Sequence, residues 1–172
     1  MFLARHAPPI LFIYPQTNTF IIQEEKRMGY TIRPMQANDQ SYVLEMMRVF
    51  YASPAVYTNG SEEIFATDID TCLSDSPYLE GYVVEGAEGL LGYAMVAKSF
   101  STEFGKPCIW IEDLYIQAPY RGQGIGQAVI AHIAAKYPSS ILRLEVEVEN
   151  EHAVHVYRKS GFTTLPYLEM KK

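Results

Sequence analysis

The 172-residue sequence has few cysteines, no long hydrophobic run and no excess of basic residues. Its two cysteines, Cys72 and Cys108, lie in apolar surroundings without metal-ligand spacing, which argues against a disulfide framework or a cysteine-ligated zinc. The apolar stretch 8–15 is too short to cross a bilayer and is interrupted by prolines. With 14 basic and 20 acidic residues the net charge is −6, which argues against a nucleic-acid-binding surface. We therefore expect a cytoplasmic protein with free thiols that binds neither membrane nor nucleic acid.

The first residues stand apart because no motif involves them. Arg5 and Ala7 do not supply the basic start and cleavage site of a signal peptide. We expect residues 1–28 to be an N-terminal extension of unknown role, either a non-catalytic addition or an arm that packs on a partner subunit. Residues 29–172 have the length of a single domain.

Local patterns predict most of the secondary structure. We expect a strand over 30–34, a helix from Asn38 to about Tyr51 and a second helix capped by Ser61. Two strands flank the turn 86–89, which is a hairpin signal. Alternating apolar and charged residues predict a strand over 141–148, and we expect a last strand over 163–171.

The central feature is an apolar strand, 108–116, followed by the glycine-rich loop 117–126 and then a helical pattern. The first N–H groups of a helix have no partner inside it, and the peptide dipoles place partial positive charge there. Gly122, Gly124 and Gly126 remove the side chains that would keep a diphosphate away, and Arg121 adds a full charge. This layout predicts a site for a phosphate-bearing cofactor.

The spacing of the loop excludes two familiar phosphate motifs. The dinucleotide fingerprint needs a third glycine where Gln127 stands, and the triphosphate loop needs a lysine that is absent. What fits is Arg121-x-x-Gly124-x-Gly126, and here the sequence resembles the GCN5-related N-acetyltransferases (GNAT). A second block, with Asn150, Ala153, Tyr157 and Gly161-Phe162, matches the family's downstream motif without a gap.

The resemblance covers about residues 30–170 and implies a fold, a cofactor and a site. The implied fold is an α/β mixed sheet, mostly antiparallel, with a splayed parallel pair formed by its fourth and fifth strands and helices on its flanks. The implied cofactor is acetyl-CoA, the acetyl donor. Its implied contacts are Leu114, Tyr115, Ile116, Arg121, Gly122, Gln123, Gly124, Ile125, Gly126, Gln127, Asn150, Ala153 and Tyr157.

Two residues are candidates for proton transfer. Tyr157 lies on one helical face with Asn150 and Ala153, and a phenol stays protonated at neutral pH, so it is the candidate general acid. Glu112 is the candidate general base, since an amine bound as a cation must lose a proton before it attacks. The alternatives are a packing tyrosine and an electrostatic anchor. A zinc site at His152 and His155 lacks a third ligand, so no metal is expected.

The acceptor is predicted less directly. The stretch from Glu112-Asp113 to Gly126 looks like the diamine and polyamine N-acetyltransferases, which implies a small-molecule primary amine. Candidate substrate contacts are Tyr51, Tyr57, Asp113 and Glu145; the alternatives are packing for the two tyrosines and solvation for the charged strand face that carries Glu145. A protein lysine or N-terminal acetyltransferase, and a regulatory module that binds acetyl-CoA without transfer, are the alternatives. A homodimer is left open.

Overall fold

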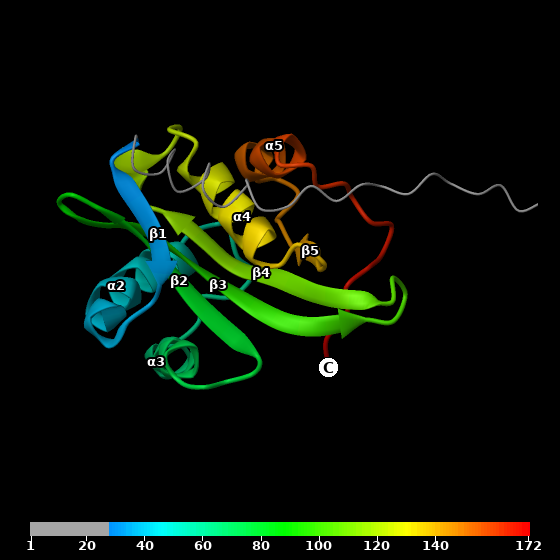
Figure 1. Ribbon diagram of the computed structural model, residues 1–172, viewed down its shortest axis with the longest axis horizontal. Helices are drawn as coiled ribbons and strands as arrows, with labels where there is room; N and C mark the ends of the chain where they lie inside the picture. The colour runs from blue at the N-terminus through cyan, green and yellow to red at the C-terminus, as the bar shows by residue number, and fades with distance from the viewer. Residues whose placement is uncertain (1–27) are drawn as a thin grey trace, which may run out of the picture.

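The computed structural model describes residues 28–172, so the predicted role of residues 1–28 lies almost entirely outside the described residues. The chain builds one five-stranded sheet in the order β1-β2-β3-β4-β5 (Figure 1). Three successive pairs are antiparallel, and β4 pairs with β5 in parallel. This confirms the predicted mixed sheet. The strands are β1 Tyr30–Pro34, β2 Leu79–Gly86, β3 Gly89–Ser101, β4 Lys106–Ile116 and β5 Ile141–Leu144.

Helices cover both faces of the sheet. Figure 1 shows α2 and α3 on one face and α4 and α5 on the other. Ser61 caps α3 as predicted, because its hydroxyl accepts the N–H of Ile64 at 3.2 Å. The helices are α2 Gln40–Tyr51, α3 Glu62–Leu73, α4 Ile125–Lys136 and α5 Glu151–Lys159, with short 3-10 turns at η1 Ala37–Asp39 and η2 Ala118–Tyr120.

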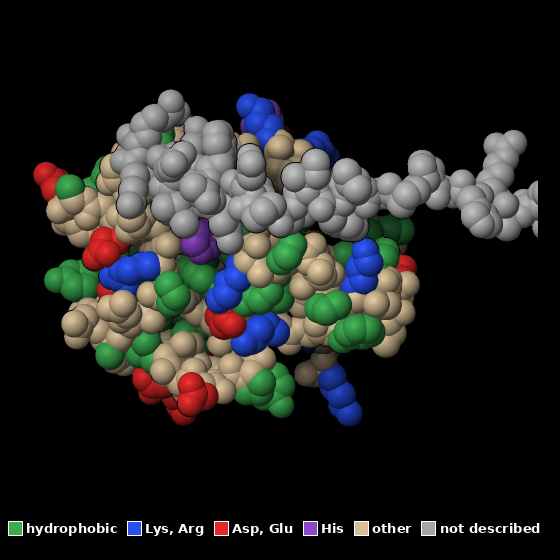
Figure 2. All heavy atoms as spheres, in the orientation of Figure 1, with side chains coloured by type: hydrophobic (Ala, Val, Ile, Leu, Met, Phe, Trp, Pro, Cys, Tyr) green, Lys and Arg blue, Asp and Glu red, His purple; other side chains and the backbone are tan. Residues whose placement is uncertain are grey.

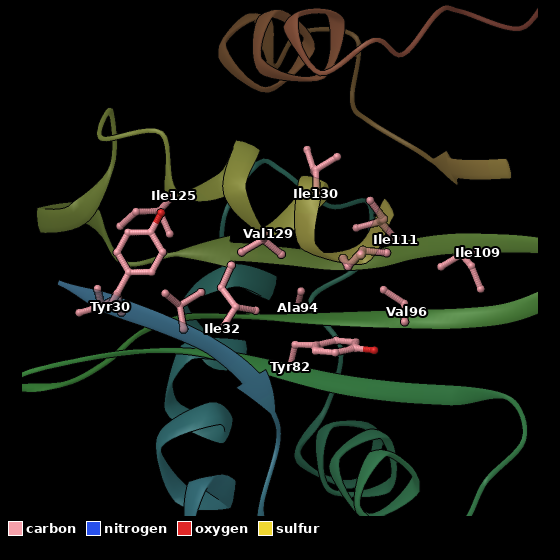
Figure 3. Close-up of a cluster of buried hydrophobic side chains, with 13 residues drawn as sticks. Tyr30, Ile32, Tyr82, Ala94, Val96, Ile109, Ile111, Ile125, Val129 and Ile130 are labelled. Atoms are coloured by element: carbon pink, nitrogen blue, oxygen red, sulfur yellow. The ribbon is translucent and has the colours of Figure 1, made fainter. Parts of the chain in front are cut away.

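Each face of the sheet buries its own hydrophobic cluster. Figure 3 shows the cluster under α4, where side chains of the strands point toward Ile125, Val129 and Ile130. The second cluster lies under α2 and α3 and includes Tyr93 and Tyr115. The strands between them are buried on both sides, so the sheet is a rigid platform for the loops at its edge.

Three sequence predictions differ from the structure. Asn38 does not cap the first helix but lies inside η1, where the Asp39 carboxylate accepts the N–H of Gln36 at 2.8 Å. The strand predicted over 141–148 ends at Leu144. The predicted last strand over 163–171 is irregular chain, and Pro166 within it lacks the N–H that a strand ladder needs.

Surface composition is mixed. On the face shown in Figure 2, basic and acidic side chains lie among one another without forming one continuous basic patch over the residues drawn in colour. Between residues 28 and 172, none of the helices has the length and apolar character needed to span a bilayer.

Candidate active site

A β-bulge at Glu112 sets the geometry of the site. Asp113 pairs with Met95 and Ile111 pairs with Val96, so Glu112 is the extra residue on β4. Ile111 packs in the cluster under α4, whereas Asp113 contacts the α2 and α3 side through Tyr93. Two residues apart on a regular strand, both would face the same side. The bulge therefore turns Asp113 to the opposite face and leaves Glu112 exposed between them.

Asp113 is a buried carboxyl held by two phenols. Its side chain accepts the hydroxyl of Tyr51 at 3.0 Å and that of Tyr93 at 2.9 Å, and the residue is only 3% exposed. Burial raises the pKa of Asp113 to about 6, although both hydrogen bonds favour the charged form. The carboxylate in turn raises the pKa of Tyr51, after the larger effect of burial. Asp113 thus supports Tyr51 from within the core.

Asp113 should make stability depend on pH. Because its pKa is about 6 in the folded protein against 3.8 ordinarily, the folded state binds more protons between these values. Its contribution is therefore most favourable below about pH 4 and is lost as pH rises through about 6. A difference of two pKa units corresponds to roughly 3 kcal/mol. Asp113→Asn, neutral at every pH, should gain about that much in unfolding free energy relative to wild type between about pH 4 and 7, measured by urea unfolding.

Asp39→Asn is the matched contrast, because hydrogen bonds from Arg33 lower the pKa of Asp39. Stability from that carboxylate is present above its ordinary pKa and is lost as pH falls, so this variant should lose stability at neutral pH but not at low pH. Parallel pH profiles for wild type and Asp113→Asn would contradict the assigned titration.

The β4 strand has an open edge beside the bulge. Pairing between β4 and β5 ends at Ile111 and Leu144, while β4 continues to Ile116. Over Glu112–Ile116, β4 pairs only with β3 among residues 28–172. Leu114 and Ile116 are half-buried toward the α4 side, whereas Tyr115 is buried on the α2 side. An extended ligand arm could therefore pair with this edge as a further strand would.

The glycine loop leads directly into the start of α4. Gly122 and Gly124 have φ of 74° and 80°, the left-handed region that favours glycine. A Cβ atom added at Gly122, Gly124 or Gly126 would meet nothing within 4 Å among the described atoms. The space in front of the α4 N-terminus is therefore open, and the unpaired N–H groups of the first turn face a cradle that side chains would fill.

The other predicted loop residues are placed differently. The Arg121 Nε donates to the Ile116 carbonyl at 2.7 Å, and its guanidinium lies 5.4 Å from the centre of the Tyr115 ring. This holds a positive charge beside the end of β4. Gln123 donates to the Pro119 carbonyl at 3.3 Å. Ile125 is 3% exposed in the core, so only its backbone N–H can meet a ligand. Gln127 is half-buried on the first turn of α4.

The α5 residues lie on the same face of the sheet as the loop. The side chain of Asn150 caps α5 by accepting the N–H of Ala153 at 3.2 Å. Tyr157 packs against Phe162 with ring centres 6.0 Å apart, and burial raises the pKa of its phenol. Among residues 28–172 its hydroxyl has no hydrogen-bonding partner. Tyr157 therefore presents a protonated phenol that can serve a ligand.

Acidic side chains gather near the bulge. The pKa of Glu112 is raised by partial burial and by the charges of Glu169 and Asp68. The pKa of Glu145 is raised to about 7 by partial burial, by a hydrogen bond shared with Glu169 and by the charges of Glu169 and Glu112, which outweigh Arg143. We call Glu112, Glu145 and Glu169 the carboxylate cluster. Within the described part of the chain, no three His, Cys, Asp or Glu residues are arranged to hold a metal ion.

The two candidate tyrosines have different surroundings. Tyr51 is engaged with Asp113 and packs on Phe65, with ring centres 5.0 Å apart. Tyr57 is 83% exposed, and the Lys171 ammonium lies 4.9 Å from its ring centre. The structure therefore places Tyr51 with Asp113, and Tyr57 at the surface beside Lys171.

Sequence reasoning missed three residues of this environment: Asp68, Tyr93 and Glu169. Tyr93 and Asp68 stand in apolar or helical runs with no motif around them. Glu169 belongs to a segment predicted as an ordinary strand. The β-bulge at Glu112 arises from the register between β3 and β4, and no local sequence pattern indicates it.

The chain is similar in sequence to known acetyltransferases. Residues 44–162 match the sequence profile of the Acetyltransferase (GNAT) family. A thialysine N-epsilon-acetyltransferase from Bos taurus is 30% identical over 151 residues, covering 80% of this chain and 86% of that protein. A spermine/spermidine N(1)-acetyltransferase from Bacillus subtilis is 29% identical over 100 residues, covering 53% of this chain and 66% of that protein.

Solved structures share the fold. A possible acetyltransferase from Clostridium difficile 630 superposes with a TM-score of 0.71 at 17% identity, covering 83% of this chain and 96% of that one. At that identity the likeness shows the same architecture of sheet and helices.

Proposed function

The chain belongs to the GNAT family of acetyl-CoA-dependent N-acetyltransferases, and we propose that its acceptor is a small cationic primary amine, such as a diamine or polyamine. The main support for this proposal is the carboxylate cluster at the β4 bulge. Partial burial and the negative charge of Glu169 raise the pKa values of Glu112 and Glu145. A cation bound among these carboxyls would relieve their repulsion. Two relatives, named for thialysine and for spermine or spermidine, agree with such an acceptor.

The loop residues fit the diphosphate of acetyl-CoA, which when bound supplies a thioester-activated acetyl group. The cradle before α4 lacks side chains at its three glycines, and the helix N-terminus provides N–H donors and partial positive charge. Arg121, fixed by its bond to the Ile116 carbonyl, adds a full charge at the mouth. The open edge of β4 offers backbone groups to the pantetheine arm, and its N–H groups can stabilise a developing oxyanion.

Acceptor and donor would approach from opposite faces of the sheet. Tyr51 and Asp113 belong to the α2 and α3 face, whereas the loop and Tyr157 belong to the α4 and α5 face. Among residues 28–172, β4 has no partner on its β5 side beyond Ile111, so groups from the two faces of the sheet could approach each other at this edge beside Glu112. We therefore assign amine binding to the carboxylate cluster and acetyl-CoA binding to the glycine loop.

Glu112 would act as the base. It is exposed at the bulge, and its raised pKa makes it a better proton acceptor than an ordinary glutamate. The same carboxylates that bind an ammonium also favour its charged form, so attack needs a group that removes the proton. Transfer should accelerate with pH until the bound amine is neutral or the base is fully ionised.

The decisive experiment compares acceptors and pH in one assay. We expect wild type to acetylate diamines and polyamines efficiently and neutral amines poorly, measured as thiol release from acetyl-CoA. Glu112→Gln should weaken transfer to diamines more at pH 7 than at about pH 9, because an amine with a pKa of roughly 10.4 then needs less help losing its proton. Glu149 is an exposed glutamate that does not belong to the carboxylate cluster, so Glu149→Gln should leave the rates at both pH values unchanged.

Aminoglycosides, peptide N-termini and lysine-containing peptides complete the panel. Efficient acetylation of a neutral or anionic acceptor, with no turnover of any polyamine or lysine, would overturn the assignment. A strong preference for peptides over free diamines would point instead to a protein acetyltransferase.

A further inference from the structure

The segment formed by residues 163–172, here called the C-terminal segment, crosses from α5 to the acceptor side of the sheet. Figure 1 shows its red trace leaving α5, passing the turn between β3 and β4 and ending below the sheet. The Tyr167 hydroxyl donates to Glu103 in that turn at 2.8 Å. Farther along, the Lys171 ammonium lies 4.9 Å from the centre of the Tyr57 ring. The segment is thus attached at two points.

Between these two contacts the segment contributes Glu169 to the carboxylate cluster. Glu169 lies between Tyr167 and Lys171 in this segment, and its negative charge helps to raise the pKa values of Glu112 and Glu145. Two residues of extended chain span at most about 7 Å, so the backbone of Lys171 lies within roughly that distance of the Glu169 backbone. The Lys171 ammonium, which lies over the Tyr57 ring, is therefore carried by the same short segment as Glu169.

The Lys171 contact has the chemistry proposed for the acceptor. Its side chain is a primary ammonium on a flexible alkyl stem, as in a diamine, and it rests on an aromatic face that is otherwise exposed. A cation over an exposed ring is held by only about 0.5–1 kcal/mol, so the lysine can leave Tyr57 readily. Tethering by a short flexible segment gives an effective concentration on the order of millimolar. Lys171 would thus compete with free amines at the same site.

We propose that Lys171 is an acetylation site, modified within the same molecule by the active site of this chain. The inference rests on the proposed function, because it uses the same donor and the same amine-binding residues. The lysine loses a proton, a bond forms between its Nζ and the acetyl carbon, and the thioester carbon–sulfur bond breaks. The thiolate leaves with the electron pair and takes up a proton. The product is an amide that carries no charge.

Acetylation would change the position of the segment. The neutral amide loses the cation–π attraction to Tyr57 and no longer matches an acidic surface. The modified segment should then leave the acceptor side, so that free amines meet no tethered competitor. Self-acetylation would therefore relieve inhibition by the unmodified segment.

The test incubates the full chain with acetyl-CoA and no added amine, and locates acetyl groups by peptide mass spectrometry. We expect Lys171 to be acetylated at a first-order rate independent of protein concentration. Lys171→Arg, which keeps the charge but cannot accept the acetyl group here, should abolish the modification while spermidine turnover persists. Lys172→Arg is the matched control and should leave acetylation of Lys171 intact. Gly124→Asp, designed to prevent donor binding, reveals any spontaneous acetylation.

Each outcome separates the two proposals. Turnover of spermidine without acetyl on Lys171 overturns self-acetylation and leaves the proposed function standing. Equal modification of Lys171 and Lys172, unchanged in Gly124→Asp, shows spontaneous chemistry and also overturns it. A rate that rises with protein concentration shows transfer between molecules, against the intramolecular proposal. If neither spermidine nor Lys171 is acetylated, the proposed function fails together with the inference.

Discussion

Gly124→Asp is expected to lower the affinity for acetyl-CoA by roughly a thousandfold while the protein remains folded. Two like charges about 4 Å apart repel by about 4 kcal/mol at an effective dielectric constant near 20, which corresponds to that factor. The carboxylate would enter the open cradle before α4, where an added Cβ atom at position 124 meets no described atom within 4 Å. It would also sit at a helix N-terminus that otherwise attracts the diphosphate. Isothermal titration calorimetry with acetyl-CoA measures the loss.

Two control variants separate charge from backbone strain. Gly124→Asn has nearly the same size and tolerates the left-handed φ of 80°, so its affinity should fall much less. Gly105→Asp places the same charge at a left-handed glycine in the turn between β3 and β4, also with nothing within 4 Å, and should leave affinity unchanged. Wild-type affinity in Gly124→Asp would show that the diphosphate binds elsewhere.

Tyr157→Phe is expected to lower turnover by about a hundredfold, the usual size of general acid catalysis, without weakening acetyl-CoA binding. Burial raises the pKa of Tyr157, so the phenol stays protonated over the whole working pH range and can give its proton to the departing sulfur. Because the hydroxyl bonds to no residue between 28 and 172, its removal should cost little stability. The ring keeps its packing on Phe162. Single-turnover kinetics at saturating donor measure the chemical step.

Tyr78→Phe provides the control, because this tyrosine is 72% exposed and directly precedes β2. It should match wild type in both rate and affinity. If Tyr157→Phe keeps the wild-type single-turnover rate, Tyr157 is a packing residue and the leaving thiolate takes its proton from another donor.

The loop and its helix were predictable because their determinants are local. Glycine spacing after an apolar strand specifies left-handed turns at Gly122 and Gly124 and an uncovered helix start. Ser61 likewise caps its helix through contacts within one turn. Such interactions join residues close in sequence, so they can be inferred without knowing how the sheet is assembled.

The strand boundaries at the site were harder to predict because they depend on partners distant in the chain. The alternation from 141 to 148 indicates a strand, but a strand exists only where a neighbour pairs with it, and β4 pairs with β5 only as far as Leu144. Over the last residues, Pro166 weakened a pattern that otherwise read as a strand. Hydrophobic alternation alone does not report these limits.

The sequence by itself determined the glycine loop before α4, the strand that precedes it and the family resemblance, since these depend on spacing and local backbone preference. Only the tertiary structure decided that Asp113 turns toward Tyr51 and Tyr93, because the bulge at Glu112 arises from the register between β3 and β4. It also decided that Lys171 reaches Tyr57 across 114 positions of sequence, the difference between 171 and 57. Register and long-range contact are set by the packing of the whole sheet, and no single segment encodes them.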